Sequence, residues 1–407
     1  MSKNKVDINI KPFGFLDLLE FKKLIPGRKN RIAGASAEPI NETPPVNALA
    51  NRLHPDYQYL SVSEIIENTE KAKTYRLIPD KNSGTFDLAQ FRPGQYLSFT
   101  FNIEDTVVTR PYSISSSPKE ALSDFYEITI EKTNGGYVSN HIFNNWQIGT
   151  EVKCSDPQGH FYYEKLRDSK KVIGLAGGCG ITPFKSIAKS IIDGTSDIEL
   201  TLFYGSNTIN DIIFHKELDE LAKESEGKIK IIHVLSEEKA EDFENGFLTC
   251  DLIKKYVNPK DTTVFICGPQ VMYKFLHKEL QALNLRRKFI RWETFGEIKD
   301  INQAEEYPRG KTKENYQIIV HMGGNKQSIT ASAKESVLVA MERAGMNPPS
   351  ICRSGSCGFC RSLLIKGDVY ITDTDDGRRL ADKEYGYIHP CSSFPLSDLE
   401  IIVPRAR

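Results

Sequence analysis

The chain has 407 residues, with 53 Lys and Arg against 54 Asp and Glu, and this length predicts two to four domains. A net charge of −1 argues against a strongly basic nucleic-acid-binding protein, and 39% hydrophobic with 26% charged residues is typical of a globular chain rather than a disordered one. No apolar run reaches the roughly 18 residues of a membrane span, and acidic residues interrupt the N-terminal apolar segment, so we expect no transmembrane span, no secretory signal and a cytoplasmic location with reduced thiols.

The first 56 residues match neither of the patterns that follow them. Phe13–Ile25 is apolar enough to form a short helix, although its apolar side chains fall nearly all round a helical wheel. Residues 33–48 contain three prolines and are predicted to be a linker. Three roles for this extension stay open: a helix packed on the rest of the chain, a docking helix for a partner, and a peripheral membrane anchor assisted by its basic residues.

Residues 57–165 contain two segments whose residue types suit a flavin. In the first, Arg-Pro-Tyr-Ser at 110–113, a guanidinium can fork onto a phosphate, a ring can stack on an isoalloxazine and a hydroxyl can hydrogen-bond to its polar edge. The second, Gly-Gly-Tyr-Val-Ser at 135–139, has glycines that let backbone N–H groups approach a pyrophosphate. Taken alone, the first segment is also consistent with a turn that carries a surface arginine.

Residues 166–300 show strands alternating with helices, which predicts a parallel sheet with its ligand at the carboxyl ends of the strands. A strand from Lys171 runs into the glycine turn at 177–180 and then a helix that begins near Pro183, an arrangement that binds phosphate although it is not the G-x-G-x-x-G fingerprint. Further strands are predicted at Ile198–Tyr204, Ile229–Val234 and Thr263–Cys267. Cys267 ends the last of these, where a small apolar residue is often only packing.

Four of the eight cysteines are clustered near the C-terminus, at Cys352, Cys357, Cys360 and Cys391. The spacing C-x4-C-x2-C followed by a distant cysteine is that of a plant-type [2Fe–2S] site, and small residues in the loop allow amide groups to point at the sulfides. A zinc site is the alternative, but zinc ribbons prefer two well-separated C-x2-C pairs. The remaining cysteines are scattered singly, at Cys154, Cys179, Cys250 and Cys267.

The segments around these four cysteines predict a small domain of strands and one helix. Tyr316–Met322 alternates like a strand and is expected to pair with Gln327–Ala331 across a turn at 323–326, and Ser336–Gly345 is predicted to be a helix. Two later strands are expected at Ser362–Ile365 and Leu399–Val403. The eight histidines show no ligand spacing, and His54, His160 and His389 are expected to be surface or structural residues.

Together, these motifs resemble two known families. Residues 57–300 resemble the ferredoxin–NADP reductase superfamily through R-P-Y-S, G-G-x-V-S, G-G-C-G-I-T-P, Cys267-Gly268-Pro269 with Met272, the Pro157–Gly159 hinge stretch and Glu293-Thr-Phe295. Residues 315–407 resemble a plant-type ferredoxin. The resemblance implies an antiparallel flavin-binding β-barrel at 57–165, a doubly wound parallel-sheet nucleotide domain at 166–300, a linker at 301–314 and a β-grasp ferredoxin domain at 315–407, after the extension at 1–56.

The resemblance also implies residue roles. Arg110 and Ser139 would contact the flavin phosphates, Tyr112 would stack on the flavin and Ser113 would reach the ring near N5. The implied catalytic residues are Ser113, Cys267 and Glu293, of which the last two would lie near the nicotinamide C4. The implied cluster ligands are Cys352, Cys357, Cys360 and Cys391. The implied cofactor-binding residues are Arg110, Tyr112, Ser113, Gly135, Gly136, Val138, Ser139, Gly177, Gly178, Gly180, Thr182, Pro183, Gly205, Ser206, Cys267, Gly268, Pro269, Met272 and Phe295.

The cofactors that this family implies are FAD, NADH or NADPH, and a [2Fe–2S] cluster. FAD is favoured over FMN because the 135–139 segment resembles the FAD-using branch, although an FMN-using branch shares the domain order. NADH is favoured because Asn207 stands where NADPH-using relatives commonly place an arginine, and Glu237 and Glu238 would repel a 2′-phosphate. The expected function is electron transfer from NAD(P)H through flavin and cluster to a partner such as an oxygenase, a desaturase or another iron redox enzyme. The alternatives are a stand-alone oxidoreductase for a quinone or ferric chelate, and a redox-sensing regulatory subunit.

Overall fold

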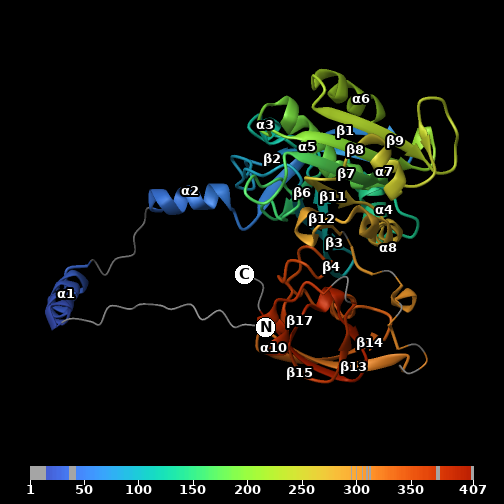
Figure 1. The fold of residues 1–407 in the computed structure, drawn as a ribbon. Coiled ribbons are helices and arrows are strands. Elements are labelled where there is room, and N and C mark those ends of the chain that lie inside the picture. Colours follow the sequence, from blue (N-terminus) through green and yellow to red (C-terminus); the bar gives the residue numbers. More distant parts are fainter. Residues whose placement is uncertain are drawn as a thin grey trace. The chain divides into compact units, whose positions relative to one another are not determined.

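The computed structural model describes residues 15–35, 43–294, 296–298, 300–304, 306–308, 310, 313–372 and 376–404. The chain forms two compact units, Met1–Leu49 and Ala50–Arg407, and each is considered by itself. Figure 1 shows the second unit to contain three bodies built around sheets, which follow one another along the chain. Among the described helices, none combines the length and the apolar character that crossing a membrane requires.

The N-terminal extension is more helical than its sequence predicts. Helix α1 spans Phe15–Ala33 and therefore continues through Pro26, beyond the expected end at Ile25. The predicted linker is wrong from residue 45 onward, because α2 spans Pro45–Leu53. Proline is tolerated at the first position of a helix, where its missing N–H would have no intrahelical partner, so Pro45 can begin α2 rather than prevent it. Phe13 and Gly14 lie outside the described residues.

The first sheet of the second unit is antiparallel throughout, with the strand order β4-β3-β6-β1-β2-β5. Its strands are β1 (Gln58–Thr69), β2 (Ala72–Pro79), β3 (Tyr96–Ile103), β4 (Thr106–Ser113), β5 (Tyr126–Glu131) and β6 (Glu151–Cys154). Helices α3 (Pro118–Ala121) and α4 (Tyr137–Asn145) lie in its connections. Leu60, Tyr75, Phe99 and Trp146 belong to its buried core, so this antiparallel sheet is the expected barrel.

The second sheet is parallel, with the order β10-β9-β8-β7-β11-β12. Its strands are β7 (Lys171–Gly177), β8 (Glu199–Ser206), β9 (Ile229–Leu235), β10 (Glu244–Asn245), β11 (Thr262–Cys267) and β12 (Ile290–Glu293). Its helices are α5 (Thr182–Ile192), α6 (His215–Glu224), α7 (Cys250–Tyr256) and α8 (Gln270–Glu279), with short 3-10 helices η1 (Gly178–Ile181), η2 (Ile209–Asp211), η3 (Leu280–Leu283) and η4 (Arg287–Phe289).

Two separate apolar clusters pack around this parallel sheet, one with α5 and α6 and the other with α7 and α8, which is the doubly wound arrangement that was expected. The chain builds outward from β7 in both directions, so the strand order reverses between β7 and β11. In such sheets the ligand binds at the carboxyl ends of the strands that flank this reversal. Those ends are the glycine turn after Gly177 and the turn after Cys267.

The third body has a five-stranded mixed sheet of order β14-β13-β19-β15-β17 and a small pair, β16 with β18. Its elements are β13 (Asn315–Met322), β14 (Asn325–Ser332), α9 (Val337–Arg343), β15 (Ser362–Lys366), β16 (Val369–Tyr370), α10 (Leu380–Glu384), β17 (Tyr387–Ile388), η6 (Pro390–Ser392), β18 (Phe394–Pro395) and β19 (Leu399–Val403), preceded by η5 (Ile301–Gln303). Strands β13 and β19 run parallel at the centre, and α9 packs against the sheet, as expected of a β-grasp ferredoxin domain.

One detail of this third body corrects the sequence prediction. Met322 pairs directly with Asn325, so the turn between β13 and β14 contains only Gly323 and Gly324 rather than four residues. Both glycines have positive φ, 63° and 90°. A two-residue hairpin turn of this kind needs such angles, and glycine adopts them without strain.

Candidate electron-transfer site

The loop after α9 brings the four C-terminal cysteines together. Cys352, Cys360 and Cys391 are buried, whereas Cys357 is exposed. The thiol of Cys360 lies 3.4 Å from the sulfur of Cys391, although 30 residues separate the two in the chain. The fold therefore gathers a loop of three thiols and a distant fourth thiol, which is the ligand arrangement of a plant-type [2Fe–2S] site.

Backbone N–H groups of the loop point at these sulfurs. Ser354 and Cys357 donate to the sulfur of Cys352 over 3.5 and 3.4 Å, and Gly355 donates to that of Cys391 over 3.2 Å. Positive φ angles at Gly355 (77°) and Gly358 (73°) let the loop wrap in this way. The donor set therefore stabilises anionic sulfur and fits a [2Fe–2S] group.

His389 lies against the cluster loop and is buried, not a surface residue. Its Nδ1 is 2.6 Å from the carbonyl oxygen of Gly355, and its exposed fraction is 2%. A Cβ added to Gly358 would come within 3.4 Å of its Nε2. His389 was expected to be either a surface or a structural residue, and its contacts with the loop show that it is structural.

The N-terminal end of the cluster loop contacts the barrel directly. The hydroxyl of Ser98 on β3 donates to the carbonyl oxygen of Ile351 over 3.1 Å, and the hydroxyls of Thr109 on β4 and Ser350 are 2.6 Å apart. Thr109 immediately precedes Arg110 of the R-P-Y-S motif. The cluster loop is therefore attached to β4, which carries the R-P-Y-S motif, and to the neighbouring strand β3.

Arg353, in the cluster loop, is a buried residue that the sequence analysis did not single out. Its side chain is fully buried, and it pairs with Glu342 on α9 and with Glu297, which follows β12 of the nucleotide domain. Burial alone would lower the pKa of Arg353, but the carboxylates of Glu297 and Glu342 raise it above its usual value. Nothing in the spacing of the cysteines could have revealed Arg353, because both of its partners come from distant segments.

On the barrel, the R-P-Y-S motif forms the end of β4. The guanidinium of Arg110 is half-buried, and its described hydrogen bond is to the carbonyl oxygen of Thr109, over 2.7 Å. Among the described residues no carboxylate forms an ion pair with Arg110. Burial, followed by the charge of nearby Arg353, lowers the pKa of Arg110. Its surroundings therefore favour an anionic group such as a phosphate.

Tyr112 and Ser113 complete this strand. The ring of Tyr112 is half-buried and lies 6.0 Å from that of Phe99 between centroids. The Oγ of Ser113 is buried and has no hydrogen-bond partner among the described residues. A buried hydroxyl without a partner is costly unless a ligand supplies one, so Ser113 fits the polar edge of a bound ring.

The Gly135–Ser139 segment forms the start of α4. Gly135 has a positive φ of 69°, and Gly136 is the N-cap residue, with no side chain capping the helix. A Cβ at Gly136 would approach the Oγ of Ser139 to 2.2 Å, so any side chain there would displace that hydroxyl. Val138 is buried in the barrel core and anchors the first turn. The free N–H groups of this turn suit a pyrophosphate.

In the nucleotide domain, the turn after Gly177 and the turn after Cys267 pack so closely that glycine is needed at their contact points. A Cβ at Gly180 would lie 2.1 Å from the carbonyl oxygen of Cys267, and one at Gly268 or Gly177 would meet the Met272 side chain within 2.8 Å. Both following helices, α5 and α8, begin without a side-chain cap, at Ile181 and Pro269. Pro183 and Thr182 form the first turn of α5, and Thr182 Oγ1 donates to the carbonyl oxygen of Cys179 over 2.9 Å.

The next strand end lies beside this pair. Gly205 pairs with Gly177 in the parallel register, and buried Ser206 ends β8. The hydroxyl of Tyr204 donates to the carbonyl oxygen of Gly178 over 3.1 Å and thereby supports the glycine turn. The structure thus collects every described candidate nucleotide residue at one edge of the sheet.

Cys267 and Glu293 face each other across the register of β11 and β12, and both are buried. The hydroxyl of Tyr273 accepts from the N–H of Gly268 over 3.0 Å and donates to the carbonyl oxygen of Glu293, so it fixes this pair. Burial, with Cys352 as the second cause, raises the pKa of Glu293 to about 8. Phe295 lies outside the described residues.

A cavity of about 520 Å³ lies where the three bodies of the second unit meet. Glu293, Cys357 and Tyr96 line it, together with the 157–159 stretch that was expected to be a hinge. Tyr96 pairs with Ser113 across β3 and β4, and a Cβ at Gly159 would lie 2.9 Å from its ring. Tyr96 therefore neighbours Ser113 of the flavin motif and shares the cavity with the cluster ligand Cys357. Burial, then the charges of Cys352 and Glu293, raises the pKa of Tyr96.

A buried ion-pair network joins the barrel to the nucleotide domain. Lys185 on α5, 4% exposed, lies 3.1 Å from Glu127 on β5, and Lys189 lies 2.7 Å from Glu120 on α3. Arg76 on β2 also bonds Glu127, over 2.8 Å. Burial alone would raise the pKa of Glu127, but Lys185 and Arg76 hold it below its ordinary value. The charges therefore hold the two domains in one arrangement.

Comparison with known proteins identifies the same three parts. Residues 60–163 match the oxidoreductase FAD-binding domain, residues 175–278 the oxidoreductase NAD-binding domain, and residues 320–396 the 2Fe-2S iron-sulfur cluster binding domain. The chain therefore binds FAD and NAD(P)H and carries a [2Fe–2S] cluster, and the barrel, parallel sheet and ferredoxin domain match these parts in order.

Relatives share this whole arrangement. The chain is 26% identical over 350 residues to the glycine betaine monooxygenase reductase subunit of Chromohalobacter salexigens, covering 83% of this chain and 93% of that protein. It is 28% identical over 346 residues, with the same coverage, to the ferredoxin reductase component of 3-ketosteroid-9-alpha-monooxygenase of Mycobacterium tuberculosis. The structure of phthalate dioxygenase reductase has the same fold, with a TM-score of 0.60 and 22% identity over 86% of this chain and 98% of that one. With its FAD, NAD and 2Fe-2S domains in this order, the chain belongs to the ferredoxin–NADP reductase superfamily, among the members with a C-terminal plant-type [2Fe–2S] ferredoxin domain.

Proposed function

We propose that this protein is the reductase component of an oxygenase, which takes electrons from NADH and delivers them singly to a separate iron-containing partner. Its electron-transfer chemistry follows from its family; the oxygenase as partner rests on the relatives, whose names describe reductase components of monooxygenases. When bound, the flavin accepts the electron pair of a nicotinamide hydride and releases it one electron at a time, and the [2Fe–2S] group carries single electrons.

The observation that carries the proposal is the attachment of the cluster loop to β3 and β4 of the barrel, of which β4 carries the R-P-Y-S motif. Ser98 and Thr109 bind Ile351 and Ser350, directly before the first cluster ligand. A domain that only sensed redox state would not need this contact with β3 and β4. The contact supports a role in which the ferredoxin domain is the outlet for electrons from the flavin.

The barrel residues have separate proposed tasks. Arg110 and the free N–H groups of the first turn of α4, where Gly135, Gly136 and Ser139 lie, bind the flavin phosphates. Tyr112 packs on the flavin ring, and the unpartnered Oγ of Ser113 donates a hydrogen bond to the polar edge of the ring near N5.

The nucleotide residues act at the reversal of the strand order. The turns at Gly177–Gly180 and Gly268–Pro269, together with Gly205 and Ser206, accept the nicotinamide nucleotide at uncapped helix starts. Cys267 and Glu293 close the site beside the nicotinamide ring and exclude water. Because burial raises the pKa of Glu293 to about 8, its carboxyl group stays protonated at neutral pH and does not place a bare charge there.

The proposed preference for NADH rests on the loop after β8. Asn207 binds the segment after β9 through its carbonyl oxygen, which accepts from the N–H of Glu237 over 3.0 Å. The carboxylate of Glu238 accepts from the N–H of Ile209 over 2.9 Å. The carboxylate of Glu238 and the backbone of Glu237 are thereby held beside the loop on which NADPH-using relatives place an arginine, and the two acidic residues would repel a 2′-phosphate.

The test is anaerobic reduction followed by partner-coupled turnover. Rapid mixing with NADH should bleach the flavin first and the cluster second, and addition of the oxygenase encoded nearby in the genome should give NADH-dependent product. Turnover of a quinone or ferric chelate at least as fast as that of any oxygenase, and independent of the cluster, would instead support a stand-alone oxidoreductase. Absence of steady turnover with every acceptor would support a regulatory subunit.

A further inference from the structure

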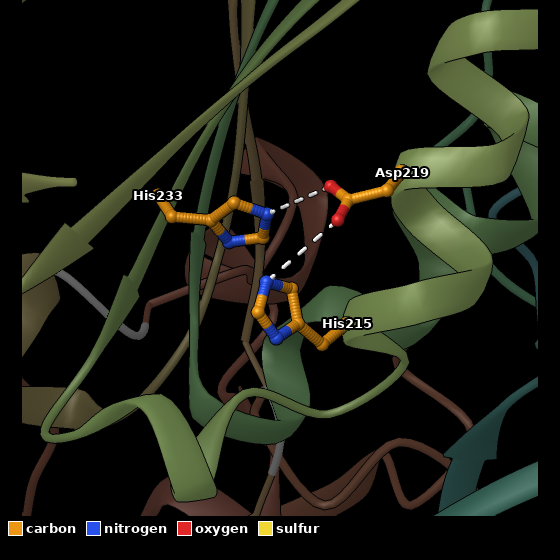
Figure 2. Close-up of side chains that lie close together, drawn as sticks. All are labelled: His215, Asp219 and His233. Carbon is orange, nitrogen blue, oxygen red and sulfur yellow. Dashed lines mark ion pairs between the residues drawn. The ribbon is translucent and has the colours of Figure 1, made fainter. Parts of the chain in front are cut away.

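Two histidines and an aspartate come together between α6 and β9 of the nucleotide domain (Figure 2). His215 is the first residue of α6, Asp219 follows one helical turn later, and His233 lies on β9. The Oδ1 of Asp219 is 3.6 Å from Nε2 of His233, and its Oδ2 is 3.8 Å from Nε2 of His215. One ligand atom from each residue lies within 4.8 Å of the other two.

The expectation that the histidines show no ligand spacing concerned the sequence and did not cover residues that the fold brings together. The i, i+4 spacing of His215 and Asp219 places both on one face of a helix, but a histidine and an aspartate at this spacing are common without any ion. The third member comes from β9, and only the packing of α6 against that strand brings it close. The sequence alone therefore could not identify the group.

His233 is the residue that calls for a ligand. Its side chain is only 10% exposed, and neither ring nitrogen has a hydrogen-bond partner among the described residues. Figure 2 shows its ring directed toward Asp219 and His215. A buried imidazole whose nitrogens both lack a hydrogen bond is costly unless something binds it.

We propose that His215, Asp219 and His233 bind a divalent transition-metal ion of the zinc class, with the remaining coordination position open to water. Ligand atoms of a tetrahedral zinc site are about 3.3 Å apart, given metal–ligand distances near 2.0–2.1 Å. The observed separations from Asp219 are 3.6 and 3.8 Å, and all three ligand atoms lie within 4.8 Å of one another, so rotation of the side chains would have to shorten them to this value. Two imidazoles and one carboxylate select such an ion over Mg²⁺ or Ca²⁺, which prefer oxygen ligands.

The surroundings give the site a defined role. Phe243 packs against both imidazoles, with ring centroids 5.8 Å from each, and so shields one side of the group. His215 and Asp219 are 32% and 47% exposed, so an ion has access from solvent. Tyr204, whose hydroxyl supports Gly178, pairs with His233 in the sheet register. A bound ion would therefore fasten α6 to β9 and stiffen the strand next to the nucleotide turn, without touching the electron path.

The test uses the full-length protein with its flavin and cluster in place, so that the cluster cysteines are already occupied. After mild chelation, the protein is dialysed against micromolar Zn²⁺, and zinc, iron and flavin are measured per chain. We expect one zinc per chain with unchanged iron and flavin, together with a rise in thermal midpoint. Mg²⁺ in place of Zn²⁺ should give neither effect. Failure of the wild-type protein to retain zinc at micromolar concentration would overturn the proposal.

Variants then locate the ion. His215→Gln and Asp219→Asn are the first choices because both side chains are partly exposed, and each should lower zinc retention at least tenfold and remove the thermal shift. His321→Gln is the matched control, since His321 is 2.8 Å from Glu400 in a histidine–carboxylate pair for which the structure describes no second histidine. If His215→Gln and Asp219→Asn, with normal flavin and iron content, still retain one zinc, the site is not the one proposed. Neither result depends on which acceptor the protein serves.

Discussion

The barrel has two junctions, and they are built differently. Toward the nucleotide domain, buried charges of both signs meet, with Lys185 on Glu127 and Lys189 on Glu120. Toward the ferredoxin domain, the hydrogen bonds described from the barrel come from the hydroxyls of Ser98 and Thr109. Arg353 adds an ion pair from the cluster loop to Glu297, but that residue follows β12 and does not belong to the barrel.

The difference indicates how precisely each of the two reaction steps, hydride transfer to the flavin and single-electron transfer to the cluster, must be positioned. Hydride transfer requires the nicotinamide and flavin to be held at near-contact distance, so a rigid junction between their two domains suits it. Transfer of a single electron requires no shared atom, so a junction of two hydroxyl contacts suffices. The predictions below separate the two steps, starting with the change of largest effect.

Replacing a cluster ligand should stop electron transfer from the flavin to the cluster while leaving flavin reduction by NADH intact. Cys357→Ser removes one of the four thiolates, so we expect cytochrome c reduction to fall by about 10³-fold or more while ferricyanide reduction by the flavin stays near the wild-type rate. Both rates are measured with NADH as donor. Equal retention of both activities would show that the cluster is not on the electron path. Cys250→Ser, at a scattered cysteine, is the control that should alter neither rate.

The charged junction should be sensitive to loss of one partner. Lys185→Met leaves Glu127 buried with only Arg76 opposite, and removing one member of a buried pair typically costs ~3–5 kcal/mol of unfolding free energy. Denaturant titration of the holoprotein measures it, and flavin release should accompany the loss. Lys170→Met is the matched control, because Lys170 and Asp197 form an exposed pair and little change is expected. A similar loss of unfolding free energy in Lys185→Met and Lys170→Met would show that the buried pair is no more important than the exposed one.

The same junction should weaken in acid. The pKa of Glu127 is lowered in the folded protein, so its contribution to stability is present above the unfolded value near 4.5 and is lost as the pH falls below it. The difference in thermal midpoint between wild type and Glu127→Gln should therefore shrink between pH 6 and pH 4. A constant difference over this range would mean that the Glu127 charge does not stabilise the junction.

A change in the loop after β8 should affect only binding of the nicotinamide nucleotide and hydride transfer from it. Asn207→Arg supplies a guanidinium for a 2′-phosphate, so kcat/KM for NADPH relative to NADH should rise by about 10-fold, equivalent to ~1.4 kcal/mol. The rate from reduced flavin to cluster should stay unchanged. Asn207→Gln is the control of similar size without charge. Wild-type values that are equal for the two nucleotides would already contradict the proposed NADH preference.

The smallest effect is expected at the hydroxyl junction. Thr109→Val removes one partner of the 2.6 Å contact with Ser350, and loss of a neutral hydrogen bond costs ~1 kcal/mol. We therefore expect a small change in thermal midpoint and a cluster reduction rate within about threefold of wild type. A loss as large as that of Lys185→Met would show that the two junctions are equally rigid.

The sequence predicted the features that local patterns determine. The strands of the parallel sheet, the cysteine spacing and the glycine turns each depend on neighbouring residues, and the predicted strand at Leu399–Val403 agrees with β19. The connection of Arg353 to Glu297, the Glu127–Lys185 pair and the meeting of His215 with His233 depend on segments that only the tertiary fold brings together. The extent of α1 was underestimated, because the apolar segment used for the prediction ends at Ile25 whereas α1 continues through Pro26 to Ala33.

The covalent connection between β12 and β13 has one more consequence. Because the ferredoxin domain is part of the same chain, its effective concentration at the barrel is set by the connecting segment and is on the order of millimolar, whatever the affinity of the junction. Ser98 and Thr109 need only orient the cluster loop, not hold it against dissociation. An acceptor protein that binds the ferredoxin domain would have to compete with these hydroxyl contacts and with the Arg353–Glu297 ion pair, and the covalent connection would favour return of the domain to the flavin.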